Sequence, residues 1–148
     1  MSEKVSIGIL AVQGAFAEHQ AMLDGLGADT FLIRQKKDLE EAVQNGRLQG
    51  IVLPGGESTV QGKLLRDLGM SDQLKELIEA GTPVLATCAG LILLAERVSN
   101  DDRAYLKTLP VSVKRNAYGR QLGSFVTDAE IAHIGTCLLY TSDAADEL

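Results

Sequence analysis

The chain has 148 residues, 45% of them hydrophobic and 23% charged, which is the usage of a folded globular domain and excludes disorder as its main state. Fourteen basic against twenty acidic residues give a formal net charge of −6, so the basic footprint of a nucleic-acid-binding protein is absent. We expect no targeting or membrane segment, because no window approaches the roughly 20 apolar residues of a spanning helix. Two cysteines and two histidines without ligand spacing predict a reduced, cytoplasmic setting with no metal, cofactor or disulfide framework.

Short apolar runs of strand length alternate with segments of helical periodicity along the first hundred residues. The expected strands are 5–12, 29–33, 50–53 and 83–87, and the expected helices are 15–26, 36–44, 58–68, a helix from Ser71, and 90–98. We expect Ser58 and Ser71 to act as helix caps. In the first helix, Phe16, Met22, Leu23 and Leu26 can share one face.

Near-continuous apolar strands separated by helices are typical of a parallel sheet that is covered on both faces. The sequence therefore predicts an α/β fold of three layers, a mostly parallel sheet between helices. After Asn100 the pattern changes, and segments 111–114 and 124–126 alternate like half-exposed, antiparallel strands. Residues 136–148 do not continue the strand pattern.

Three loops follow the carboxyl ends of predicted strands, at 13–14, 54–58 and 87–90. In parallel sheets, ligands collect beyond these ends. The convergence of the three loops is the main indication of a functional site.

Cys88 follows a predicted strand and precedes a helix that opens Ala89-Gly90. This is the strand–turn–helix context of a nucleophile elbow, with cysteine in place of serine. A helix N-terminus favours the thiolate, and the amide of Ala89 would face an oxyanion. The amide of Gly56 is a candidate second donor. The structural alternatives are a buried, inert cysteine and a simple strand-to-helix turn.

The remaining candidates have weaker signals. Gln13 either ends the first strand or bridges the neighbouring loops through its side-chain amide. Arg115 is either a solvated basic residue or a clamp for a substrate carboxylate. His19 is expected on a helix surface away from the strand ends, and His133 falls in a late strand-like segment. Neither is followed two residues later by an acid, so we assign neither as a catalytic base.

Taken together, the motifs resemble those of a known family. Segments 11–15, 53–59, 87–95 and 115–121 read Ala-Val-Gln-Gly-Ala, Leu-Pro-Gly-Gly-Glu-Ser-Thr, Thr-Cys-Ala-Gly-Leu-Ile-Leu-Leu-Ala and Arg-Asn-Ala-Tyr-Gly-Arg-Gln. Over about residues 4–135 the chain resembles the glutaminase subunits of pyridoxal 5′-phosphate synthase, which are class I, triad-type glutamine amidotransferases with a flavodoxin-like sheet. The resemblance implies hydrolysis of L-glutamine to glutamate and ammonia. The ammonia would pass to a barrel-fold synthase subunit that makes pyridoxal 5′-phosphate, vitamin B6.

The resemblance also implies roles for individual residues. The resemblance implies that Cys88 is the nucleophile and that Gly56 and Ala89 are the oxyanion donors. It implies that glutamine is contacted by Gly56, Glu57, Ser58 and Arg115. The implied role of Gln13 is to tie the oxyanion loop to the partner-activated state.

The sequence departs from the family pattern in two places. Ala86 stands where the family has glycine, and we expect the small side chain to be tolerated unless the turn needs a positive φ there. The family's later Ile-Arg glutamine contact and final His-x-Glu are absent. We therefore expect an incomplete amidotransferase domain over 1–135, a non-native tail over 136–148 that resembles translated vector sequence, low stability, and glutamine hydrolysis at background rates.

Two other functions stay open on the sequence. One is a catalytically dead subunit that binds the synthase without hydrolysing glutamine. The other is a flavodoxin-like nucleotide-binding module, which is disfavoured because no Gly-x-Gly-x-x-Gly follows the first strand.

Overall fold

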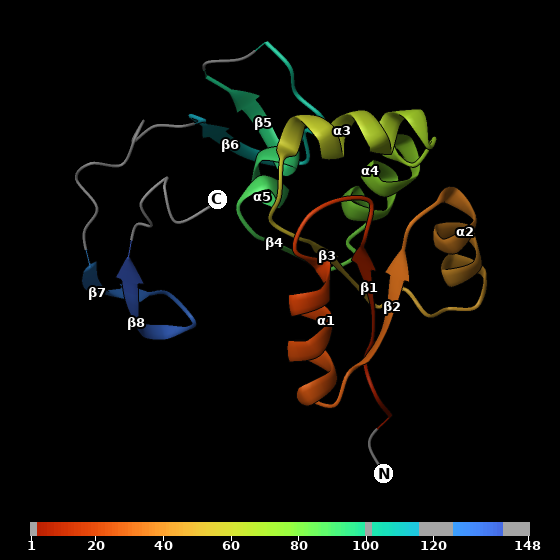
Figure 1. The fold of residues 1–148 in the computed structure, drawn as a ribbon, viewed down its shortest axis with the longest axis horizontal. Helices are drawn as coiled ribbons and strands as arrows, with labels where there is room; N and C mark the ends of the chain where they lie inside the picture. Colours follow the sequence, from red (N-terminus) through yellow and green to blue (C-terminus); the bar gives the residue numbers. More distant parts are fainter. Residues whose placement is uncertain (1–2, 100–101, 116–125, 141–148) are drawn as a thin grey trace. The chain divides into compact units, whose positions relative to one another are not determined.

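The computed structural model describes residues 3–99, 102–115 and 126–140, the side chains of 137–140 excepted. The chain divides into two compact units, Met1–Val113 and Lys114–Leu148, each of which is considered by itself. Figure 1 labels their elements in chain order.

A four-stranded parallel sheet is the centre of the first unit (Figure 1), with the strand order β2-β1-β3-β4. Its strands are β1 (Ser6–Leu10), β2 (Asp29–Ile33), β3 (Gly50–Leu53) and β4 (Val84–Ala86). All three neighbouring pairs are parallel, and Ile7 of β1 lies opposite Thr30 on one side and Gly50 on the other. The predicted parallel sheet is confirmed.

Five helices connect these strands or follow the last of them. They are α1 (Phe16–Gly25), α2 (Lys36–Gln44), α3 (Ser58–Asp67), α4 (Ser71–Glu79) and α5 (Ala89–Leu94). The chain moves from β1 outward to β2 and then back past β1 to β3. Because parallel crossovers are right-handed, this reversal places α1 and α2 on opposite faces of the sheet. The expected three-layer α/β arrangement is therefore confirmed.

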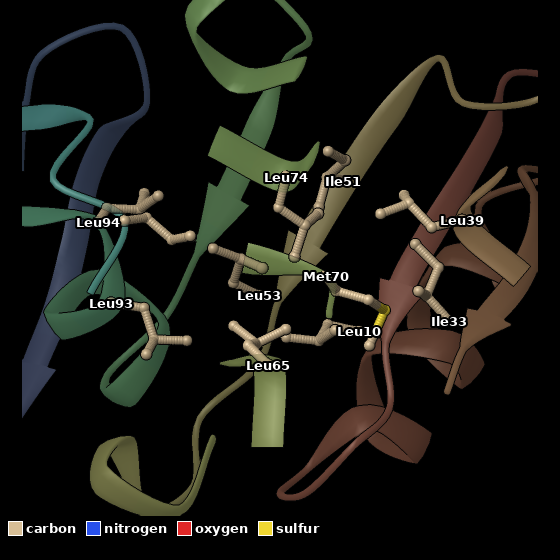
Figure 2. Close-up of a cluster of buried hydrophobic side chains, with 11 residues drawn as sticks. Leu10, Ile33, Leu39, Ile51, Leu53, Leu65, Met70, Leu74, Leu93 and Leu94 are labelled. Atoms are coloured by element: carbon tan, nitrogen blue, oxygen red, sulfur yellow. The ribbon is translucent and has the colours of Figure 1, made fainter. Parts of the chain in front are cut away.

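The hydrophobic core lies on the face of the sheet that α2, α3 and α4 cover. Figure 2 shows the cluster, and its fully buried members include Leu10, Ile33, Ile51, Leu53, Leu39, Leu65 and Leu74. Complete burial of one such side chain contributes about 1.5–3 kcal/mol relative to exposure. Alternation along the strands selects these residues, since Ile51 and Leu53 belong to the cluster while Val52 between them does not.

Helix α1 contributes no buried residue, although four apolar residues of the predicted helix are expected to share one face. Met22 and Leu26 are 67% and 75% exposed. Periodicity identifies residues that share a face, but it does not specify whether another element covers that face.

The expected caps are also wrong. Glu57, not Ser58, is the N-cap of α3, and its carboxylate accepts the amides of Thr59 at 3.1 Å and Val60 at 2.7 Å. Met70 precedes α4 and makes no side-chain capping bond. Each predicted cap is instead the first residue inside its helix.

The segment after α5 forms a strand, contrary to the predicted helix over 90–98. Strand β5 (Ala95–Val98) pairs in parallel with β6 (Leu109–Val113), so the antiparallel pairing expected for the region after Asn100 is wrong for β6. Ala95 is fully buried and Val98 is 4% exposed. Pairing with β6 satisfies backbone groups that a longer helix would have bonded internally, and tertiary contacts override the local preference.

The second unit contains an antiparallel hairpin of β7 (Val126–Ile131) and β8 (Gly135–Tyr140). His133 in the connecting turn has φ 67°. Strand β8 runs into the segment 136–148, so the strand pattern continues further than expected. Residues 124–125 of the predicted second strand lie outside the described residues. Across the parts of the chain that the structure describes, no helix combines the length and apolar character needed to cross a membrane.

Candidate functional site

The strand order reverses at β1, which has β2 on one side and β3 on the other. The loops that follow β1 and β3 leave the sheet in opposite directions from this point, and such a switch point is the usual ligand position in an open α/β sheet. These are the loops at 13–14 and 54–58 that the sequence singled out. The loop after β4, which carries Cys88, is next along the same edge.

The first two loops are hydrogen bonded to each other. The Gln13 Oε1 accepts the amide of Glu57 at 2.9 Å, and the amide of Ala15 donates to the Gly55 carbonyl at 2.9 Å. Gly14 has φ +101°, and a Cβ added there would overlap the Gly55 carbonyl oxygen. Glycine is required at this crossing both for the backbone conformation and for the close approach.

Gln61 is a residue of this site that the sequence interpretation missed. Its side chain is fully buried, and its Nε2 donates to the carbonyls of Gln13 at 3.1 Å and Pro54 at 3.2 Å. Through these two bonds, a side chain of α3 joins the loop after β1 to the loop after β3. The available signal was the Ser58-x-x-Gln61 spacing, which resembles a capping box and places a long amide in the first helical turn.

Cys88 occupies a strained turn between β4 and α5. Its backbone has φ 49° and ψ −109°, a conformation that costs a non-glycine residue about 1–3 kcal/mol, and the residue is exposed. The amide of Thr87 donates to Leu53 O at 3.1 Å and the Thr87 carbonyl accepts Gly90 N at 2.8 Å. A Cβ added to Gly90 would overlap the Leu53 carbonyl, so glycine allows α5 to start directly against β3. The geometry is that of a sharp elbow that presents its thiol.

One predicted oxyanion donor, Ala89, directly follows Cys88, and the other, Gly56, belongs to the loop after β3. A Cβ added at Gly55 would lie 3.5 Å from the Cys88 Cβ, so the loop after β3 passes beside the cysteine. In the described part of the chain, the amides of Gly56 and Ala89 donate no hydrogen bond. Gly56 is exposed, whereas Ala89 is only 1% exposed. Because α5 has only six residues, its dipole supports a thiolate less than the predicted nine-residue helix would.

The predicted glutamine contacts have different surroundings. Both carboxylate oxygens of Glu57 bond helix amides, and Ser58 is only 3% exposed. Arg115 belongs to the second unit, and residues 116–121 of its motif lie outside the described residues. The roles of these residues in binding stay predictions.

The structure corrects the expectation for one histidine. His19 lies on α1, and its Nε2 is 3.1 Å from Oγ1 of Thr87, the residue that precedes Cys88. His19 therefore lies near a strand end, contrary to the expectation. His133 is exposed in the turn of the second unit. Ala86 lies in β4 and is not among the described non-glycine residues with positive φ, so the backbone there does not require glycine.

The first cavity considered does not coincide with the candidate site, and the described residues contain no metal site. A cavity of about 500 Å³, lined by residues such as Glu96, Arg97 and Lys107, includes none of the candidate site residues. Within residues 3–99, 102–115 and 126–140, no three His, Cys, Asp or Glu side chains are grouped as a metal site would require.

Comparison with known proteins gives matches over most of the chain. The model of the SNO glutamine amidotransferase family matches residues 9–141, six residues beyond the predicted domain boundary at 135. The chain is 57% identical over 129 residues to the "Pyridoxal 5'-phosphate synthase subunit PdxT" of Desulfitobacterium hafniense (strain DSM 10664 / DCB-2), covering 87% of this chain and 62% of that protein. The protein of the same name from Bifidobacterium adolescentis is 55% identical over 123 residues, covering 83% and 57%.

A solved structure agrees with these relatives. The structure described as "Crystal structure of glutamine amidotransferase" superposes with a TM-score of 0.77 at 38% sequence identity, covering 90% of this chain and 69% of that one. The chain thus spans somewhat less than two thirds of the length of the two curated relatives.

Proposed function

Because this chain belongs to the SNO glutamine amidotransferase family, we propose that its site acts on L-glutamine, releasing glutamate and ammonia through an acyl-enzyme on Cys88. The observation that carries the proposal is the strained, exposed turn at Cys88, which Gly55 of the loop after β3 approaches.

The proposed reaction has two steps. The Cys88 thiolate attacks the side-chain carboxamide carbon of glutamine, and the amides of Gly56 and Ala89 donate to the oxyanion of the tetrahedral intermediate. The C–N bond then breaks, the nitrogen takes a proton from solvent water and leaves as ammonia, and a thioester remains. Water attacks the thioester carbon and releases glutamate, and the sulfur departs as thiolate.

The interlocked loops supply the rigidity that the oxyanion donors need. Removal of one oxyanion donor in other enzymes costs about 10²–10³ in rate, so its placement must be maintained. The bond from the Glu57 amide to Gln13 Oε1 fixes the residue that follows Gly56. We assign Gln13 to this support, and Gly56, Glu57, Ser58 and Arg115 to the binding of glutamine, with Glu57 acting through its main chain because its carboxylate caps α3.

General-base catalysis is the part of the reaction that we do not assign to a residue. The His-x-Glu pair that the family resemblance implies does not occur among the 148 residues. A positioned base is worth about 10²–10⁴-fold in rate. Acylation of Cys88 is the step that these 148 residues support, and we expect it to be detectable.

The names of the relatives support a proposed partner and setting. Both are described as subunits of pyridoxal 5′-phosphate synthase. We assign to this chain the supply of ammonia to a barrel-fold synthase subunit that makes pyridoxal 5′-phosphate, in the cytoplasm. A second candidate is one that the sequence leaves open, a subunit that docks on the synthase and does not hydrolyse glutamine.

A glutamine-analogue diazoketone distinguishes the two candidates. We expect it to modify Cys88 and not Cys137, as read by peptide mass mapping, with L-glutamine slowing the labelling and D-glutamine leaving it unchanged. Cys88→Ser should abolish labelling, while Cys137→Ser should not. Equal labelling of both cysteines, or none of Cys88, would rule out a preserved acylation site and favour the docking subunit. Co-purification with the synthase subunit tests docking separately.

A further inference from the structure

His19 and Thr87 are 68 residues apart in the chain and are joined by a hydrogen bond of 3.1 Å between Nε2 and Oγ1. His19 lies in the first turn of α1, a helix with no buried residue. Helix α1 packs against β1 and β2 through half-buried side chains and also makes specific polar contacts. Two of these contacts join the start of α1 to the loops of the site. The amide of Ala15 donates to the Gly55 carbonyl, and the His19 ring is hydrogen bonded to the Thr87 hydroxyl.

Thr87 directly precedes the strained Cys88. Its amide bonds Leu53 O at 3.1 Å and its carbonyl bonds Gly90 N at 2.8 Å, so both main-chain groups are fixed. The bond to His19 fixes the side chain as well, by selecting one rotamer. A strained residue such as Cys88, with φ 49°, keeps its conformation only when its surroundings over-determine it.

We propose that His19 is a positioning residue for Cys88, acting through the hydroxyl of Thr87. The inference rests on the proposed function only in taking Cys88 as the residue that is acylated. Without the His19 bond, the Thr87 side chain can rotate and the turn can relax, so the thiol is presented for reaction less often.

Imidazole and hydroxyl are well matched for this task. A protonated ring, or a neutral ring with its proton on Nε2, donates to Oγ1, while the other tautomer accepts from the threonine hydroxyl. The tie therefore persists in every charge state and tautomer of His19. It requires no catalytic proton transfer by the histidine.

The test is the rate at which iodoacetamide alkylates Cys88 in the full chain, followed by peptide mass mapping, with Cys137 in the same sample as an internal reference. His19→Leu should slow Cys88 alkylation roughly two- to tenfold, the range that one hydrogen bond corresponds to. His19→Gln retains an amide that can donate and accept at similar reach, and should restore most of the rate. Gln20→Leu, the same kind of change one residue along α1, should leave the rate unchanged.

A double-mutant cycle separates positioning through Thr87 from a general loosening of α1. Thr87→Val removes the hydroxyl and preserves the side-chain shape, so it should slow Cys88 by a similar factor. His19→Leu combined with Thr87→Val should be no slower than Thr87→Val alone. A merely structural role for His19 would multiply the two effects.

Three results would overturn the proposal: a wild-type alkylation rate in His19→Leu, no rescue by His19→Gln, or a multiplicative cycle. If circular dichroism shows that His19→Leu does not fold, Thr87→Val decides, and a wild-type rate in that variant overturns the proposal. Diazoketone labelling tests the proposed function independently of the positioning role. If Cys88 is not labelled by the diazoketone but its alkylation still depends on His19, the proposed function is wrong and the positioning role is retained.

Discussion

At the scale of single residues, the conformation and surroundings of Cys88 depend on residues that are distant in the sequence. Its positive φ is maintained by bonds from Thr87 to Leu53 and from Gly90 to Thr87, and Gly55 approaches its Cβ. A glycine would adopt this backbone without strain but would supply no nucleophile. Strain concentrated at a reactive side chain is typical of functional sites.

Gln61 gives the sharpest prediction at this scale. Gln61→Leu keeps the volume but leaves the buried carbonyls of Gln13 and Pro54 without the Nε2 donor. We expect the free energy of unfolding to fall by about 1–3 kcal/mol, the cost of buried unsatisfied polar groups. Urea titration followed by circular dichroism measures it.

The control for Gln61→Leu is Gln44→Leu, the same substitution at an exposed position at the end of α2. Its expected effect is within about 0.5 kcal/mol. Equal destabilisation by the two variants would mean that the bonds of Gln61 do not stabilise the crossing of the loops.

At the scale of elements, local sequence preference and tertiary pairing disagree after α5. Residues 90–98 have the apolar composition of a buried helix, yet the helix ends at Leu94 and β5 begins at Ala95. The partner strand β6 lies more than ten residues further along the chain, so periodicity within the segment cannot reveal it. The shorter helix also weakens the dipole behind Cys88.

Helix α3 carries an exposed ion pair between Lys63 and Asp67, spaced i,i+4. The hydrogen bond from Lys63 lowers the pKa of the Asp67 carboxyl below its ordinary value of 3.8, with a smaller contribution from Arg66. A lowered folded-state pKa means that the pair stabilises the protein above the unfolded pKa, and that this contribution is lost as pH falls through the folded value. Lys63→Met should therefore raise the pKa of Asp67 toward 3.8, as read by NMR titration of the carboxyl carbon.

The matched control is Lys37→Met, which removes a second i,i+4 pair, with Glu41 on α2. It should leave the Asp67 titration unchanged. An unchanged Asp67 pKa in Lys63→Met would show that the pair does not persist in solution. Any stability difference between wild type and Lys63→Met should disappear at pH values below the folded pKa of Asp67.

At the scale of the whole molecule, the four-stranded sheet has an apolar edge at β4. Among the described residues β4 pairs only with β3. Leu85 is 53% exposed and Leu91 39% exposed, and both line an apolar cavity of about 420 Å³. An exposed apolar edge strand is a template for pairing with another chain, while the net charge of −6 opposes association.

We therefore expect concentration-dependent self-association that Leu85→Lys reduces, because a lysine on an edge strand disfavours edge-to-edge pairing. Sedimentation velocity over a concentration series measures it. Leu26→Lys makes the same change in charge on α1, at a residue 75% exposed and away from the edge, and should have little effect. An equal reduction by both variants would assign the effect to net charge alone.

The sequence by itself determined the layers and the location of the site. Periods of two and 3.6 residues distinguish strands from helices, and glycine-containing loops after apolar strands mark a carboxyl edge. On that basis β2, β3 and α2 were predicted at their observed bounds, and the loops carrying Gln13, Gly56 and Cys88 were identified.

Only the tertiary structure decided which residues support those loops. Gln61 reaches the site because α3 starts beside the loop that follows β1. His19 reaches Thr87 because α1, which connects the parallel strands β1 and β2, runs back along the sheet. The same holds for the capping by Glu57, the exposure of Met22, and the parallel pairing of β5 with β6. Each depends on a contact between segments far apart in the chain, and local patterns carry no information about such contacts.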